Sequence, residues 1–175
     1  MKKIVSICLI LSSLSLSGQE KAIIGMTITE VTRIYPDIKK DSNENGITLS
    51  RPVKLYGLEG YWGYRFKDSK LYWIFFDKYI NNITAENFNL CLSATNNLIR
   101  DFTVQYGQPD TLIKGDTTFK DPNKVRHWGY DVLEARWKNF NNMKIKVELT
   151  FLGGKEQYSF LVKISYFDKL YPYYD

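Results

Sequence analysis

The sequence predicts an α+β fold in which an antiparallel sheet carries helices on one face, and three observations favour this class. Two helical patterns, over residues 27–36 and 84–107, are each followed by runs in which apolar and polar residues alternate. Short polar or glycine-containing turns join these runs, as in antiparallel hairpins. Landmarks of the first half recur in the second, which predicts a tandem duplication of a unit made of one helix and three or four strands.

The N-terminal residues 1–18 are typical of a cleaved signal peptide. Two lysines precede an apolar run over residues 4–11, and small residues follow up to a cleavage position near Ser17. The run is too short to span a bilayer, and a buried N-terminal strand or helix is the alternative interpretation. Cys8 lies inside the apolar run, where a lipid-attachment cysteine is not expected. We therefore expect a periplasmic or secreted protein that is not an integral membrane protein.

The composition limits both the partners and the means of stabilisation. The 175 residues carry a formal net charge of +5, which is too weak and too dispersed to predict nucleic-acid binding. Once the signal peptide is removed, Cys91 is the remaining cysteine, so no intramolecular disulfide is expected and stability depends on packing. The length predicts one compact domain, with its two halves at residues 19–82 and 83–175.

The first half begins with a short helix. Thr27 is a good N-cap, Glu30 completes a capping box, and Pro36 ends the helix. Residues 41–46, "DSNENG", read as a polar loop.

The strands of the first half follow this loop. One or two short strands over residues 47–58 are interrupted at Pro52, which favours an edge position or a bulge. Residues 60–66 and 70–79 flank a short polar turn and predict a hairpin. The second arm is apolar on both faces, so we expect a central strand that is covered on both sides.

The second half begins with a longer helix, from a cap at Thr84 to Gly107, and Pro109 prevents its continuation. Its apolar stripe includes Cys91, which we interpret as a buried core residue. Residues 114–131 are loop-like, with room for a short strand. Residues 134–140 predict a strand, and residues 143–151 and 158–166 alternate cleanly around a Gly-Gly turn, which predicts a hairpin with one apolar face.

The duplication is predicted from paired landmarks. Two pairs recur at nearly the same offset: Pro-Asp at residues 36–37 and 109–110, and Arg-aromatic-Lys at residues 65–67 and 136–138. A third pair, Trp-Gly-Tyr at residues 62–64 and 128–130, has a shorter offset, so one half requires an insertion or this match is chance.

Two of these stretches resemble a known family. Residues 24–37, "IGMTITEVTRIYPD", resemble the opening of bacterial envelope modules of the SmpA/OmlA type, and "VQYGQPD" at residues 104–110 resembles the Gly-x-Pro-Asp-like exit of their helix. Tandem units of helix and antiparallel sheet also resemble the β-lactamase-inhibitor-protein fold. The chain lacks the lipid-bearing cysteine of the outer-membrane assembly lipoproteins and the paired cysteines of the secreted inhibitors. The resemblance implies an exported, non-catalytic module that acts by binding.

The predicted binding residues belong to the two Trp-Gly-Tyr segments. They are Trp62, Tyr64, Trp128 and Tyr130. Trp and Tyr combine apolar bulk with a polar tip, which suits protein interfaces and sugar stacking, so these rings would be anchors on the sheet or its rim. The alternative is that they are core residues and that the glycine between them permits a bulge.

The sequence gives little support for a catalytic site or a metal site. His127 is the single histidine and has no evident nucleophile beside it, so we predict no catalytic residue. Residues 41–46 offer oxygen ligands but lack the twelve-residue calcium pattern, so we predict no metal and no cofactor. Lys144, Lys146 and Lys163 fall on the polar side of the last hairpin, as a solvated face or a modest anion-facing patch.

The sequence therefore predicts a module that binds another protein of the cell envelope or exterior. The alternative is a binder of a small ligand, such as a sugar or a peptide, that uses an aromatic surface. An enzyme is the third possibility, and the oligomeric state is left open.

Overall fold

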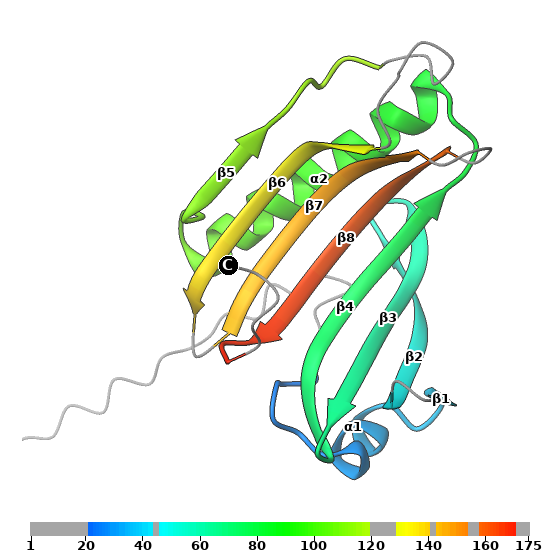
Figure 1. Cartoon of the computed structure of the whole chain (residues 1–175), viewed down its shortest axis with the longest axis vertical. Helices are drawn as coiled ribbons and strands as arrows, with labels where there is room; N and C mark the ends of the chain where they lie inside the picture. Colours follow the sequence, from blue (N-terminus) through cyan, green and yellow to red (C-terminus); the bar gives the residue numbers. More distant parts are fainter. Residues whose placement is uncertain (1–20, 44–45, 120–128, 141–142, 154–157, 171–175) are drawn as a thin grey trace, which may run out of the picture.

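The computed structural model describes residues 21–43, 46–119, 129–140, 143–153 and 158–170 (Figure 1). The predicted signal peptide, His127 and Trp128 lie outside these ranges. Within them the chain forms two helices and one eight-stranded antiparallel sheet with the strand order β1-β2-β3-β4-β8-β7-β6-β5. The predicted α+β class is confirmed at this level.

The same order of elements occurs twice along the chain. The first series is α1 (Ile28–Ile34), β1 (Lys39–Asn43), β2 (Gly46–Leu55), β3 (Leu58–Lys67) and β4 (Lys70–Ile80). The second series is α2 (Ala85–Tyr106), β5 (Thr111–Lys114), β6 (Gly129–Phe140), β7 (Met143–Gly153) and β8 (Tyr158–Asp168). β4 and β8 pair at the centre of the sheet, and β1 and β5 are its two edges.

The capping box predicted for α1 is present. The Thr27 hydroxyl accepts a hydrogen bond from the Glu30 backbone N–H, and the Glu30 carboxylate accepts one from the Thr27 backbone N–H at 2.7 Å. These hydrogen bonds hold the pKa of Glu30 below its usual value. Seven residues are too few for an independently stable helix, so the buried Val31 side chain has to anchor α1 to the core.

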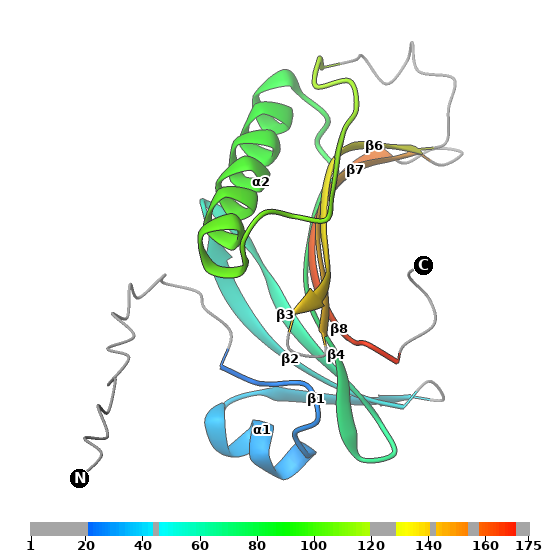
Figure 2. The same cartoon turned by 90° about the vertical axis from the view of Figure 1, so that its left-hand side faces the viewer.

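α2 packs across β6, β7 and β8 on one face of the sheet (Figure 2). The Thr84 hydroxyl caps its start by accepting from the Asn87 backbone N–H, and Gly107 ends it with a φ of +83°. Cys91 is buried on the stripe that faces the sheet, and burial raises the pKa of its thiol to about 11. Neither helix in the described ranges has both the length and the apolar character needed to cross a bilayer.

The strand register divides the side chains between two faces. We call the side that contacts α2 the helix face and the opposite side the outer face. Phe76 of β4 lies opposite Trp62 of β3 and Ile164 of β8, and all three are buried on the helix face. Ile145, Val147, Leu149 and Phe151 of β7 continue this apolar layer beneath α2.

Two predictions about the first half need correction. β2 is one continuous strand that is not interrupted at Pro52. β1 pairs with β2 only as far as Ser50, so Pro52 lies where β2 is locally an edge and no ladder hydrogen bond is lost. The polar segment 41–46 is not simply a loop, because β1 extends to Asn43 and β2 begins at Gly46. Each series contains four strands, which lies within the predicted three or four.

Candidate binding site on the outer sheet face

The structure places the first Trp-Gly-Tyr segment in the core. Trp62 is 2% exposed and packs edge-on against Phe76, with 5.9 Å between ring centroids. Tyr64 is fully buried on the same face, and its hydroxyl accepts a hydrogen bond from Arg51 Nε at 2.8 Å. Trp62 and Tyr64 are therefore core residues, which is the alternative that the sequence left open.

Of the two rings in the second Trp-Gly-Tyr segment, the structure describes that of Tyr130. Tyr130 is half-buried and packs on Phe151 with 5.4 Å between ring centroids, while Trp128 lies outside the described residues. Among the described residues, Trp62, Tyr64 and Tyr130 thus do not form an exposed aromatic surface.

Two other tyrosines are exposed on the outer face. Tyr61 directly precedes Trp62 and points to the opposite side of the sheet, where it is 59% exposed. Tyr79 of β4 is 52% exposed on the same face. The sequence analysis did not identify Tyr61, because it assigned to the surface the side of β3 that carries Trp62 and Tyr64. The polar Asp77, which lies opposite Tyr61, was the available signal that this phase faces outward.

Half-buried aromatic side chains continue the outer face beside these tyrosines. The ring of Trp73 lies 4.7 Å from that of Phe75 on β4 and 5.3 Å from that of Phe167 on β8. The Arg65 guanidinium lies over the Trp73 ring at 4.6 Å, within cation–π distance. We call Tyr61, Trp73, Phe75 and Tyr79 the aromatic cluster.

Gly63 explains how the Phe75 ring fits on the sheet. A Cβ atom at Gly63 would lie 2.2 Å from this ring, far inside van der Waals contact. The glycine of the first Trp-Gly-Tyr segment therefore makes room for an aromatic side chain of the next strand. It does not mark a bulge, because the register shift between β3 and β4 falls at Arg65 and Phe66.

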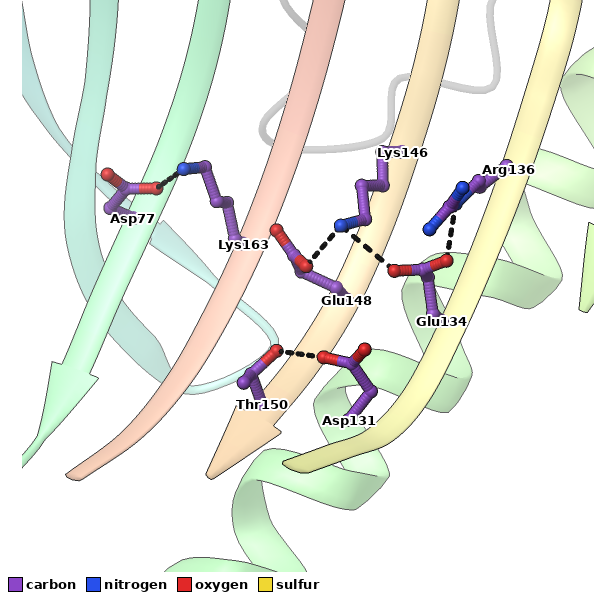
Figure 3. Close-up of polar contacts among 8 residues, drawn as sticks. All are labelled: Asp77, Asp131, Glu134, Arg136, Lys146, Glu148, Thr150 and Lys163. Atoms are coloured by element: carbon purple, nitrogen blue, oxygen red, sulfur yellow. Dashed lines mark hydrogen bonds and ion pairs between the residues drawn. The ribbon is translucent and has the colours of Figure 1, made fainter. Parts of the chain in front are cut away.

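Charged side chains of β4, β6, β7 and β8 also lie on the outer face (Figure 3). Glu134 of β6 is fully buried and accepts a hydrogen bond from Arg136 Nε. Lys146 Nζ of β7 lies 2.9 Å from Glu134 Oε2 and 2.6 Å from Glu148 Oε2. These four side chains form a continuous row across two strands, which we call the ionic network.

The protonation states follow from these contacts. Burial alone would raise the pKa of Glu134, but the hydrogen bond from Arg136 and the ion pair with Lys146 outweigh it, so the pKa lies below its usual value. Burial would lower the pKa of Lys146, yet Glu148 and Glu134 together raise it. Both partners therefore remain charged in the folded protein at neutral pH.

The ionic network leaves little capacity for a metal ion. The carboxylates of Asp131, Glu134 and Glu148 lie within 4.8 Å of one another, and oxygen ligands suit Ca²⁺ or Mg²⁺. However, Lys146 contacts both buried carboxylates, and Asp131 accepts a hydrogen bond from Thr150 at 3.0 Å. A divalent cation would have to displace Lys146, so the cluster is better described as an ion-pair network.

Lys146 and Lys163, two of the lysines on the polar side of the last hairpin, lie close to acidic side chains. Lys146 belongs to the ionic network, and Lys163 Nζ lies 3.9 Å from Asp77 Oδ1. Lys144 lies with Arg136 and Lys138 around a shallow depression at one end of the outer face. Lys146 and Lys163 are therefore better described as members of ion pairs within the protein than as a solvated face.

Asp77 is less well satisfied than Glu134. Its Oδ1 atom is buried and has no hydrogen-bond partner among the described residues, and Lys163 lies at the outer limit of ion-pair distance. Burial raises the pKa of Asp77, against a smaller opposing effect of Lys163. A carboxyl whose folded-state pKa is raised stabilises the fold while protonated, and that contribution is lost as pH rises through this pKa.

We therefore expect Asp77→Asn to increase stability at neutral pH. The amide removes the cost of keeping a carboxylate charged in a half-buried position. The difference in melting temperature from the unaltered protein should shrink as pH is lowered to about 3, where Asp77 is protonated. Thermal unfolding at both pH values measures this. A lower melting temperature for the variant at neutral pH would mean that the Lys163 ion pair outweighs desolvation.

Comparisons with known proteins give no relative from which a function could be transferred. No family model matches the chain, and neither a curated protein nor a solved structure matches it. The resemblance to SmpA/OmlA-type and β-lactamase-inhibitor-protein-like modules therefore stays a prediction, and functional inference depends on the site itself.

Proposed function

We propose that this chain is an exported, non-catalytic binding module whose outer sheet face docks another protein of the cell envelope or exterior. The observation that carries the proposal is the exposure of Tyr61 and Tyr79 beside aromatic and charged side chains, on a face that α2 does not cover. Tyr, Trp and Arg supply most of the binding energy in protein interfaces, because each offers a large contact area with few rotatable bonds or several hydrogen bonds.

The support beneath these rings favours a preorganised surface. Trp73 is held between Phe75 and Phe167, and Arg65 lies against it. The ionic network fixes the neighbouring strands β6 and β7. Side chains that are already ordered lose less conformational entropy on binding, so more of the contact energy appears as affinity.

We also propose that the fold is a tandem duplication with its boundary near residues 82 and 83, between β4 and α2. The repeated order of one helix and four strands supports this, as do the equivalent positions of β1 and β5 at the two sheet edges. The ring of Tyr35, at the end of α1, lies 5.8 Å from that of Tyr64 on the helix face. This contact supports the prediction that both helices lie on one face.

The alternative is a small ligand, such as a sugar, stacked on the aromatic cluster. Its support is the same pair of exposed rings. Small ligands are usually enclosed in concave sites that bury most of their surface. Tyr61 and Tyr79 are more than half exposed on a sheet, which favours a protein partner. A thermal-shift panel of glycans and peptides tests the alternative, since a ligand that binds only the folded state must raise its melting temperature.

The proposal predicts that Tyr61→Ala combined with Tyr79→Ala weakens partner binding by about tenfold or more. Purified protein is immobilised and exposed to envelope extract and culture medium of the source cells, and a recovered protein is then titrated to obtain its Kd. The double variant should fold normally because both side chains are exposed.

The matched control replaces two exposed apolar residues on α2, Leu90→Ala with Val104→Ala. The control should keep full affinity. Equal losses for both double variants, or recovery of no stoichiometric partner, would contradict the outer face as the docking surface.

A further inference from the structure

We infer that the protein partner inserts a basic side chain, Lys or Arg, between Tyr61 and Tyr79 so that its charge meets the carboxylate of Asp77. This inference rests on the proposed function and names the chemistry that the partner must present. It is carried by the arrangement of three side chains on strands β3 and β4 of the outer face.

The three side chains form a small acidic site with aromatic walls. Tyr61 and Asp77 lie directly opposite each other in the register of β3 and β4, and Tyr79 follows two residues further along β4. Alternation along the strand places all three on the outer face. The Asp77 side chain is 23% exposed although its Oδ1 atom is buried, so the remainder of the carboxylate is accessible beside two tyrosines that are each more than half exposed.

The carboxylate of Asp77 is less closely paired with cations than that of Glu134. Glu134 receives a hydrogen bond from Arg136 and an ion pair from Lys146 at 2.9 Å. For Asp77 the ion-pair neighbour is Lys163, whose Nζ lies 3.9 Å from Oδ1, which is 1 Å further than the contact between Lys146 and Glu134. A carboxylate accepts several hydrogen bonds, so an incoming ammonium or guanidinium group would complete its coordination.

The carboxylates of Asp77 and Glu148 favour a cation at this point, and the charges of Lys163 and Arg65 oppose it. Burial raises the pKa of the Tyr79 hydroxyl, and the negative charges of Asp77 and Glu148 raise it further. The ring faces of Tyr61 and Tyr79 attract cations through their quadrupoles. A phosphate or carboxylate would instead meet the negative charge of Asp77 at short range.

The stability argument points the same way. A half-buried, poorly neutralised carboxylate destabilises the folded chain, which is the basis of the expected gain for Asp77→Asn. Residues that lower stability in this manner are typical of functional sites, where the unsatisfied group is completed by a ligand. If the site takes a basic side chain, Asp77→Asn should therefore raise stability and lower affinity together.

The test uses two simple probes, a capped hexalysine peptide and a capped hexaglutamate peptide, titrated into the purified protein and followed by NMR. Hexalysine should shift the signals of Tyr61, Asp77 and Tyr79 and lower the pKa of the Asp77 carboxyl. Asp77→Asn should weaken its apparent affinity about tenfold. The matched control Asp41→Asn removes the same charge from an exposed position on β1 and should leave the affinity unchanged. Equal binding of hexaglutamate, an unchanged Asp77 pKa, or equal losses in the two variants would overturn the inference.

The recovered partner separates this inference from the proposed function. If the tyrosine double variant loses the partner and Asp77→Asn keeps it at full affinity, the outer face is supported as the docking surface. The inference that the partner inserts a basic side chain is then wrong. If neither variant changes partner affinity, the proposed function itself fails. Loss of affinity in both variants, with Asp41→Asn unaffected, supports both.

Discussion

Replacement of Trp62 by alanine is expected to destabilise the protein by about 3–5 kcal/mol. The indole is 2% exposed in the centre of the sheet and contacts the rings of Phe76 and Tyr166, with centroid distances of 5.9 and 6.1 Å. Its removal leaves a cavity that strands on both sides cannot collapse into. The Trp62 Nε1 group is buried without a hydrogen-bond partner among the described residues, so its loss offsets part of the cost and favours the lower end of the range. Urea unfolding measures this.

The neighbouring residue provides the control. Tyr61→Ala should change the free energy of unfolding by no more than about 0.5 kcal/mol, because the ring is 59% exposed on the outer face. The reverse pattern, with Trp62→Ala tolerated and Tyr61→Ala destabilising, would show that β3 is displaced by one residue and that its two faces are exchanged.

Replacement of Glu134 by alanine is expected to cost about 3 kcal/mol or more, the second large effect. The carboxylate is fully buried and interacts with both Arg136 and Lys146. Its removal would take away one of the two carboxylates that pair with the partly buried Lys146 and the acceptor of the Arg136 hydrogen bond. Desolvation of these charges would then be incompletely compensated. Chemical denaturation at neutral pH gives the difference directly.

The acid dependence of stability supplies a second readout for Glu134. Its folded-state pKa is lowered, so its contribution is fully present above the pKa of the unfolded chain and is lost as pH falls through the folded-state pKa. The stability difference between the unaltered protein and Glu134→Gln should therefore narrow in acid. A difference that stays constant with pH would mean that Glu134 contributes through packing rather than charge.

An exposed ion pair is the matched control for this experiment. Lys54 and Glu59 interact at 3.2 Å, but their side chains are 65% and 75% exposed. Solvent screening reduces such pairs to about 0–1 kcal/mol, so Glu59→Ala should have little effect. Comparable losses for Glu59→Ala and Glu134→Ala would contradict the assignment of the ionic network as a buried stabilising element.

The helix ends could be predicted from the sequence because they depend on local chemistry. A hydroxyl at Thr27 or Thr84 satisfies the first backbone N–H groups, and Gly107 supplies the positive φ at the end of α2. Each of these interactions spans only a few residues. The last hairpin was also predictable, since its alternation of apolar and polar residues marks one face clearly.

The candidate site could not be predicted in the same way. Around Trp62, both phases of β3 contain large aromatic residues, so local alternation does not decide which ring is buried. That choice depends on Phe76, which lies opposite Trp62 on β4, and on Ile164, which lies opposite Phe76 on β8. The sequence pattern of β3 contains neither pairing. The edge strands β1 and β5 were hard to predict, because β1 contains no apolar residue and β5 is only four residues long with both of its apolar side chains exposed.

The pairing of β4 with β8 has a consequence for how the chain reaches this structure. Every other strand pair among the described residues joins strands that are consecutive in the sequence. In the pairing of β4 with β8, for example of Ile74 with Tyr166, α2 and three strands lie between the partners along the chain. Loop-closure entropy grows with the separation of the paired residues, and folding slows as non-local contacts increase. The central joint of the sheet therefore carries the largest closure cost in the fold. Apart from this joint, the four strands on either side pair only with strands that are consecutive in the sequence.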